Sequence, residues 1–273
     1  MVSTLNNTEN KKKKISVILS AYNSEKYIGE AIESVLDQTY VHFECIIIND
    51  CSTDKTLEII KTYAKLDNRI SIINNKKNLG LTKSLNKGIS KSSGKYIARI
   101  DADDICEHSR FEKQLKYMEA NPEVAVCGSL GTYIDENGKN LGVKNLPLSS
   151  KDLKNKLLFN NQFIHSALFI RKSVLDTVGS YDESFKTSQD YELLLRIAEK
   201  YPVINLADPL VKWRIHRNSI SWKSKKQERD AIRARWLAVT KYHYPKIKGL
   251  ILISIRIIWM IIPLSVKKKR YLA

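Results

Sequence analysis

Both common glycine-rich phosphate-binding motifs are missing from the first loop of this chain. Its residues, Ala21-Tyr22-Asn23, match neither the Gly-x-Gly-x-x-Gly dinucleotide fingerprint nor the Gly-x-x-x-x-Gly-Lys phosphate loop. If the protein binds a phosphorylated ligand here, metal ions and cationic side chains must neutralise the phosphates in place of a glycine cradle.

Cysteine is scarce, and its spacing excludes a Cys-x-x-Cys site. The sequence has four cysteines, and Cys45 and Cys127 lie in apolar runs where cysteine is usually a small buried hydrophobic residue. Nothing in this pattern calls for an oxidising compartment.

Acidic residues are almost absent from the C-terminal part of the chain. Residues 212–273 contain 17 Lys and Arg against 2 Asp and Glu, whereas residues 15–211 contain 25 against 26. The net charge of +17 therefore comes from the tail and from a basic N-terminus, residues 1–14, which we expect to be flexible. A nucleic-acid enzyme carries its positive field around the active site, so we expect no nucleic-acid partner.

Strand-like and helix-like segments alternate up to residue 105. The strands are expected at 15–20, 45–48, 70–73 and 95–100. Helices are expected to start after Ser24, at Ser52/Thr53 and near Leu81. This alternation predicts right-handed crossovers and a mostly parallel sheet, with ligands beyond the carboxyl ends of its strands. The segments that should converge there are 21–23, 49–54, 74–80 and 101–104.

The second half of the chain has a different pattern, which predicts a smaller, mixed lobe on the other side of a cleft. Its strands are expected at 124–127, 132–134, 163–171, 203–206 and 210–215. A hairpin turn is expected at 135–138 and a helix at 188–200.

Three closely spaced carboxylates end the fourth strand, in Arg99-Ile-Asp-Ala-Asp-Asp104. Like charges so close repel one another, and a hard divalent cation removes that cost. Mg²⁺ or Mn²⁺ held by one or two carboxylates keeps open positions that phosphate oxygens usually fill. The alternative for an isolated cluster of this kind is a solvated acidic turn.

Asp50 adds a carboxylate at the end of the second strand, within Asn49–Asp54. It can accept the N–H of a pyrimidine ring or a ribose hydroxyl. Helix capping by Ser52 and Thr53 explains those two residues but does not account for Asp50.

In their order and spacing, seven segments resemble the inverting glycosyltransferases of family 2, which have the GT-A fold. The resemblance covers about residues 15–221, which we expect to form the catalytic domain, with a nucleotide-binding half at 15–105 and an acceptor-side half at 106–221. The segments are ISVILSAYNSEKYIGEAIESVLDQTY (15–40), IIINDCSTDKT (46–56), NLGLTKSLNKGI (78–89), RIDADD (99–104), HSALFIRKSVLDTVGSYDESF (165–185), SQDYELLLRI (188–197) and WRIHRNSIS (213–221).

The resemblance implies a role for individual residues. Asp190 falls where the family carries its catalytic base. Asp101 and Asp103 form the metal motif, with Asp103 the more direct ligand, and His216 is a further candidate ligand. The residues implied in binding the donor nucleotide are Ala21, Tyr22, Asn23, Asp50, Asn78, Asp101 and Arg214.

Three positions depart from the family pattern. Gln189 stands where Glu usually precedes the base, and Asn49 replaces the first of two aspartates. Both are near-isosteric changes that keep the essential Asp, so we do not expect a pseudoenzyme. Leu79 stands where the family often has Arg, so this position lacks the cationic side chain that the family pattern offers to phosphate or sugar.

By this resemblance, the protein is expected to move a sugar from a UDP-sugar to an acceptor hydroxyl, using Mn²⁺ or Mg²⁺. The acceptor is expected in surface polysaccharide or lipid-linked oligosaccharide assembly. A sugar nucleotidyltransferase is the rival enzyme, but its first loop should be basic and glycine-rich. The non-enzymatic alternative is a membrane-bound nucleotide-sugar-binding protein or a basic adaptor, for which metal-dependent UDP affinity and salt-sensitive RNA binding are the discriminating measurements.

The basic tail, residues 222–273, is expected to be helical and to hold the protein on the cytoplasmic face of the inner or plasma membrane. Its apolar stretch, 249–266, is interrupted by Arg256 and is marginal as a spanning helix, which needs about 20 apolar residues. Basic residues favour a surface-bound or shallowly inserted tail. The alternative is a helix buried against the catalytic domain or a second subunit, and the sequence leaves the oligomeric state open.

Overall fold

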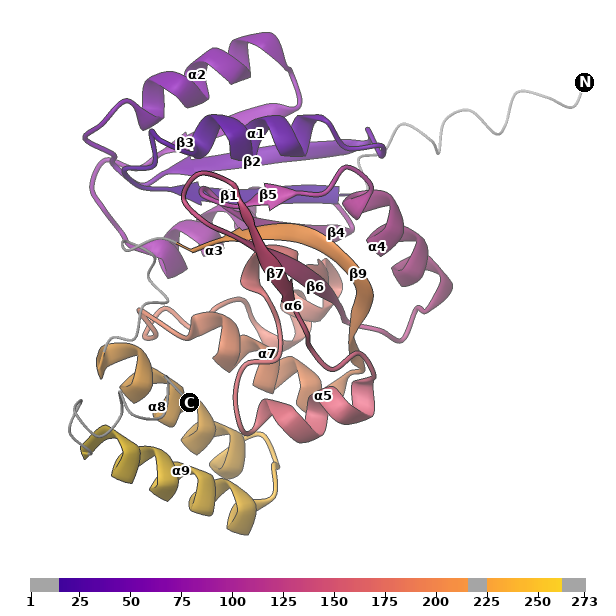
Figure 1. The fold of residues 1–273 in the computed structure, drawn as a ribbon, viewed down its shortest axis with the longest axis vertical. Helices are drawn as coiled ribbons and strands as arrows, with labels where there is room; N and C mark the ends of the chain where they lie inside the picture. The colour runs from indigo at the N-terminus through magenta and orange to yellow at the C-terminus, as the bar shows by residue number, and fades with distance from the viewer. Residues whose placement is uncertain (1–14, 216–224, 262–273) are drawn as a thin grey trace, which may run out of the picture.

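A computed structural model describes residues 15–215 and 225–261 of the protein (Figure 1). Its centre is a curled sheet in the order β3-β2-β1-β4-β8-β6-β9-β5, with β7 paired to β6. The strands are β1 (Ile15–Ala21), β2 (Phe43–Asn49), β3 (Ile70–Asn74), β4 (Tyr96–Asp101), β5 (Ile105–Cys106), β6 (Val126–Ile134), β7 (Asn140–Lys144), β8 (Phe169–Arg171) and β9 (Val203–Arg214).

Helices surround the sheet, and one 3₁₀ helix, η2, precedes β8. They are α1 (Ile28–Leu36), α2 (Thr56–Leu66), α3 (Leu81–Lys91), α4 (Arg110–Ala120), α5 (Ser150–Leu157), η2 (His165–Ala167), α6 (Lys172–Val178), α7 (Gln189–Lys200), α8 (Lys225–Thr240) and α9 (Lys246–Ile261).

The first four strands are parallel, as predicted. The register pairs Ala21 with Asn49, Asn49 with Asn74, and Ser20 with Asp101. The carboxyl ends of these strands therefore lie at one edge of the sheet, and the loops that follow them start from that edge.

Alternate residues of β1 enter different hydrophobic layers, because successive strand side chains point to opposite faces. Val17 and Leu19 pack in the layer that contains Ile32 of α1. Ile18 packs in the other layer, with Leu85 of α3. Figure 1 shows α1 and α2 on one side of the sheet and α3 on the other. Coverage of both faces explains why the strand sequences are almost continuously apolar.

The second half closes back onto the first half through antiparallel pairs. β8 pairs with β4 on one side and β6 on the other, and β9 runs parallel to β6 before it reaches β5. The predicted hairpin turn joins β6 to β7. Four short strands were predicted where the structure has two long ones. The segments 124–127 and 132–134 overlap the single strand β6, and 203–206 and 210–215 overlap β9. The register between β6 and β9 shifts around Leu130.

The predicted strand at 163–171 is also wrong in its first part, where η2 takes its place. The predicted helix starts lie too early, since α1 begins at Ile28 and α2 at Thr56. The serines expected as caps bond across the loops instead. Ser24 N donates to Thr56 Oγ1 at 2.7 Å, and Ser52 Oγ accepts from Asn23 N at 3.1 Å.

The last two helices pack on the rest of the protein through one side. Ala234, Ala238 and Val239 of α8 and Ile253 of α9 join the hydrophobic layer that also contains α7. Within the described ranges, none of the helices combines the length and the apolar character that crossing a membrane requires. The division of residues 15–221 into two halves stays a prediction.

Candidate active site

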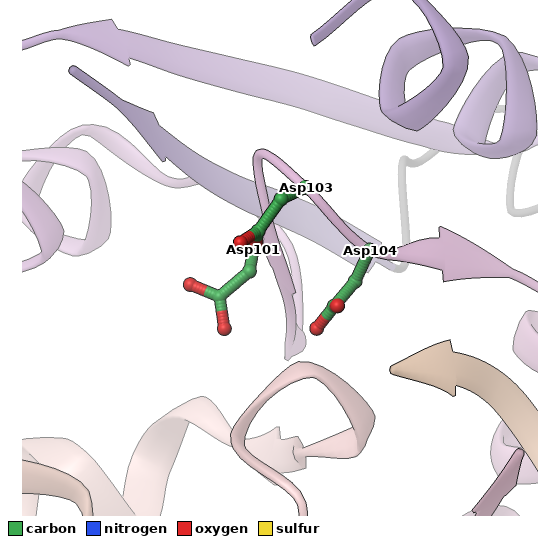
Figure 2. Close-up of side chains that lie close together, drawn as sticks. All are labelled: Asp101, Asp103 and Asp104. Carbon is green, nitrogen blue, oxygen red and sulfur yellow. The ribbon is translucent and has the colours of Figure 1, made fainter. Parts of the chain in front are cut away.

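Three carboxylates gather in the turn between β4 and β5. Ligand oxygens of Asp101, Asp103 and Asp104 all lie within 4.8 Å of one another, and Figure 2 shows the three side chains projecting to the same side of the turn. Asp104 is buried, whereas Asp101 and Asp103 are half-buried. The sequence therefore located a cluster with the donor chemistry of a hard-cation site.

Asp101 rests on a buried guanidinium. Arg99, whose side chain is 2% exposed, forms an ion pair with Asp101, and Ser166 Oγ lies 3.0 Å from Asp101 Oδ2. Burial is the largest single effect and opposes ionisation of Asp101, but the charge and hydrogen bond of Arg99, with smaller contributions from His165 and Ser166, together hold the pKa of Asp101 below its ordinary value. Asp101 is therefore a carboxylate anion whose orientation is fixed by Arg99 and Ser166.

Asp104 has the opposite electrostatic setting. Its carboxylate is bonded by Ser166 Oγ and, at 2.8 Å, by the backbone N–H of Arg214. Burial, followed by repulsion from Asp103 and Asp101, raises the pKa of Asp104 well above its ordinary value. A divalent cation at this cluster relieves that repulsion, so the residues present fit a bound Mg²⁺ or Mn²⁺.

Asp50 holds the third loop in place. Its Oδ1 accepts from Asn75 Nδ2 and Leu79 N, and its Oδ2 accepts from Gly80 N, each at 2.8 Å. Gly80 has φ +83°, a conformation that favours glycine, and it precedes the first turn of α3. Asn78 Oδ1 also accepts from Gly80 N, at 3.1 Å. The loop expected to contact the donor is thus built around one buried carboxylate.

A side-chain hydrogen bond also joins the loop after β1 to the loop after β2. Asn23, at φ +48°, accepts a hydrogen bond from Thr53 N through its Oδ1 at 2.8 Å. Ala21, at the end of β1, is buried, whereas Tyr22 is 49% exposed. The loops after β1 and β2 thus form one surface, as predicted from the parallel sheet.

Arg214, predicted to reach the donor phosphates, is buried beside the carboxylate turn. Its Nε donates to the carbonyl oxygen of Asp103 at 2.9 Å, its side chain pairs with Glu30, and it lies 4.5 Å from the Tyr27 ring centroid. The structure therefore places Arg214 as a support of the carboxylate turn. Its contact with the donor stays a prediction, and His216 lies outside the described residues.

Asp190, the predicted base, lies in the first turn of α7. Asn161 Nδ2 donates to Asp190 Oδ2 at 2.7 Å, which orients the carboxylate. Ser188, the residue before α7, has a left-handed φ of +56°, and Gln189 is buried. A half-buried acid at a helix N-terminus is stabilised by the helix dipole, so position alone does not distinguish a base from a structural acid.

His165 packs against Tyr181 and interacts electrostatically with both Asp190 and Asp101. Its Nε2 lies 3.0 Å from the Tyr181 hydroxyl, and the two rings meet edge-on at 5.8 Å. Burial and then the Arg99 charge lower the pKa of His165 to about 4, while Asp190 and Asp101 oppose the change. The imidazole is therefore neutral at neutral pH, and it lies within the electrostatic reach of both aspartates.

Several residues of this site escaped the sequence analysis. Ser166 and Tyr181 lie within the quoted segment 165–185 but were given no role, and Asn161 lies between two other polar residues without a spacing that marks it. Asp104 was visible as part of the cluster, but no feature of the sequence indicated that it would be its buried member. Lys144, half-buried over the Trp213 ring at 4.3 Å, has its pKa lowered to about 8, chiefly by burial, and Asp190 opposes this change.

The sequence and the fold both match known glycosyltransferases. Residues 16–179 match the model of glycosyl transferase family 2. The amylovoran biosynthesis glycosyltransferase AmsE of Erwinia amylovora is 34% identical over 263 residues, which cover 94% of this chain and 97% of that protein. The O-antigen biosynthesis glycosyltransferase WbnJ of Escherichia coli is 37% identical over 213 residues, covering 75% and 81%.

Solved structures share the fold at low sequence identity. TarS of S. aureus, residues 1–349 with UDP-GlcNAc, matches with a TM-score of 0.71 at 18% identity, covering 89% of this chain and 71% of that one. The mannosyltransferase PcManGT of Pyrobaculum calidifontis, with GDP-Man and Mn²⁺, matches at 0.65 and 14%, covering 95% and 79%. The expected family and fold are confirmed: the chain is a member of glycosyl transferase family 2 with the GT-A fold.

Proposed function

We propose that the enzyme transfers a sugar from a UDP-sugar to an acceptor hydroxyl by one direct displacement, which inverts the anomeric centre. The observation that carries this proposal is the cluster of Asp101, Asp103 and Asp104, which has the donor chemistry of a hard-cation site. Asp190, the proposed base, lies in the first turn of α7. TarS, which has the same fold, was solved with UDP and with UDP-GlcNAc, which supports a UDP-linked donor.

Asp101 and Asp103 would hold Mn²⁺ or Mg²⁺, with Asp104 behind them. When bound, the cation supplies Lewis-acid stabilisation for the charge that develops on the departing diphosphate. Arg99 keeps Asp101 ionised and oriented, and Arg214 holds the backbone of Asp103. PcManGT, solved with GDP-Man and Mn²⁺, gives this assignment a precedent within the fold. A ligand role for His216 is proposed from the sequence alone.

Asp190 is proposed as the general base. Asn161 holds its Oδ2, so that Oδ1 accepts the acceptor's hydroxyl proton as the new bond to the anomeric carbon forms. The bond from that carbon to the diphosphate oxygen breaks at the same time, and UDP leaves with the electron pair. A single displacement of an α-linked donor yields a β-linked product.

The proposed nucleotide site combines the loops after β1, β2 and β3. A carboxylate accepts about four hydrogen bonds, and three protein donors already reach Asp50. We assign its remaining position to the uracil or ribose, beside Ala21, Tyr22 and Asn23. Asn78 and Arg214 are assigned to the same donor from the neighbouring loop and strand.

The acceptor is proposed to be a saccharide or lipid-linked saccharide of surface polysaccharide assembly, at the cytoplasmic face of the inner or plasma membrane. AmsE and WbnJ, named for amylovoran and O-antigen biosynthesis, support this setting. Both the donor sugar and the linkage position require experiment.

A panel of UDP-sugars tests the proposal directly. With Mn²⁺ and water as acceptor, slow release of UDP from at least one donor is expected, and chelation of the metal should abolish it. UDP release that is unaffected by chelation would contradict the metal assignment. If no UDP-sugar turns over or binds, the donor assignment is wrong.

A further inference from the structure

The helices α8 and α9 form a hairpin that leaves one side of α9 uncovered. Gly249 allows the close contact on the inner side, because a Cβ there would lie 2.0 Å from Val239 Cγ1. Ile253 is buried on the same side at 7% exposure. Figure 1 shows α9 at the end of the molecule opposite α2, with α8 between it and α7.

The uncovered side of α9 is apolar, which reverses the usual arrangement of a surface helix. Six large apolar residues are between 44% and 79% exposed on this one helix of 16 residues. We call them the outer face of α9: Ile247, Leu250, Ile251, Ile255, Ile257 and Ile258. The remaining exposed large hydrophobic residues of the described chain are spread over many elements. A contiguous apolar face of this kind marks an interaction surface.

The one charge in the middle of α9 points away from this face. Arg256 lies on the inner side, where its guanidinium is 3.7 Å from the Glu228 carboxylate of α8. At 100° per residue, Ile247, Ile251 and Ile258 lie on the opposite side of the helix. Arg256, which interrupts the apolar stretch in the sequence, therefore does not interrupt this face in the structure. With Arg256 paired to α8, Ser254 is the one polar residue among the described side chains of the outer face.

Basic residues surround the hairpin. Residues 225–261 contain nine Lys and Arg against two Asp and Glu, and the sequence continues with Lys267–Arg270. Lys246 and Lys248 are exposed at the start of α9, while Lys225, Lys226 and Arg229 are exposed at the start of α8. An apolar face with flanking cations is the pattern of a helix that lies in the plane of an anionic membrane.

We infer that the outer face of α9 binds the surface of an anionic membrane, with the helix in the membrane plane and the basic residues on lipid headgroups. A protein partner would need a matching apolar and acidic face, whereas anionic lipid supplies both properties. The inference rests on the proposed function in one respect, which is that membrane binding would hold the enzyme beside a lipid-linked acceptor. Membrane binding itself requires neither the metal site nor Asp190.

Vesicle flotation of the full chain tests the inference, with phosphatidylcholine vesicles and with vesicles containing 30% phosphatidylglycerol. Binding to the anionic vesicles is expected, weakening as salt is raised. The Ile251→Asp, Ile255→Asp double variant should lose at least tenfold in the partition constant. Leu66→Asp is the matched control, because Leu66 is 78% exposed on α2, and it should bind as the wild type does.

Three outcomes would overturn the inference. They are absence of wild-type binding to anionic vesicles, unchanged binding of the double variant, and equal loss in the Leu66→Asp control. If the lipid-free wild type is a dimer that the double variant converts to a monomer, the face is instead a contact with a second copy. Release of UDP from a UDP-sugar should be unchanged in the double variant, which shows that it folds and separates this test from that of the proposed function.

Discussion

The backbone N–H of Arg214 donates a hydrogen bond of 2.8 Å to Oδ1 of Asp104, although the two residues are 110 positions apart. This bond ties the end of β9 to the turn that carries the carboxylate cluster. Asp104 is thereby used as an anchor of the turn, and Asp101 and Asp103 lie on its more exposed side. A residue at the end of β9 thus helps to shape the carboxylate turn that follows β4.

Replacing Asp103 tests the metal assignment. Asp103→Ala is expected to remove nearly all turnover and to weaken UDP binding in the presence of Mn²⁺, because the cation that would neutralise the diphosphate loses a ligand. Turnover assays and calorimetric titration with UDP measure the two effects. Asp176→Ala, which changes an exposed aspartate of α6, serves as the control. Turnover close to that of the wild type in Asp103→Ala would exclude this residue as a ligand.

Asp190→Asn separates chemistry from binding. The substitution is isosteric and can keep a bond with Asn161, so donor binding should persist while transfer falls by about 10²-fold or more. UDP calorimetry alongside a transfer assay decides the matter. Loss of UDP binding together with transfer indicates a structural role for Asp190. Retention of both UDP binding and transfer would exclude Asp190 as the base.

Asp50→Asn should loosen the third loop. Three donors converge on the carboxylate, and hydrogen bonds to charged groups contribute about 1.5–3 kcal/mol each. An amide keeps one acceptor oxygen and turns an NH₂ group toward an N–H, so we expect a loss of about 2–3 kcal/mol in the free energy of unfolding, with weaker UDP binding. Asp37→Asn, at a side chain 78% exposed, should change stability by less than about 0.5 kcal/mol. Equal urea midpoints for the two variants would contradict the prediction.

His165 should make the fold sensitive to acid. Its pKa falls to about 4 in the folded protein from the ordinary value of 6.5, so the unfolded chain binds more protons between these pH values. Stability is therefore complete above pH 6.5 and is lost as the pH falls toward 4, by about 1–3 kcal/mol.

Urea unfolding at pH 7 and at pH 4.5 measures this loss. His165→Gln should show a smaller loss than the wild type, while His108→Gln, at an exposed side chain, should behave as the wild type does. An identical pH dependence in all three proteins would show that His165 does not carry the effect.

The parallel half of the fold was predictable because buried parallel strands leave a recognisable pattern, such as the run Ile15–Ala21, which is apolar except for two serines. Segment 163–171 was not, since Ser166 interrupts the strand to bond Asp101, and a tertiary hydrogen bond has no periodic signal. The same reason explains the missed helix starts. Ser24 and Ser52 have the composition of caps but bond across neighbouring loops.

The residues of the candidate site likewise fall into those that local sequence predicts and those that depend on tertiary packing. Asp101 and Asp103 could be predicted because local spacing brings them together, and Asp190 because its sequence context resembles the family. Arg99 was part of a quoted motif, yet its burial under Asp101 follows only from the packing of β4 against η2. The apolar outer face of α9 likewise depends on Arg256 turning toward Glu228, which the linear pattern does not indicate.

The anomeric configuration of the transferred sugar tests the central claim most directly. ¹H NMR can follow the first turnovers of an α-linked UDP-sugar with Mn²⁺ and water as acceptor, before the released sugar mutarotates. A single displacement with Asp190 as the base predicts that the β-anomer appears first, at a rate that Asp190→Asn reduces. Appearance of the α-anomer first would contradict the account.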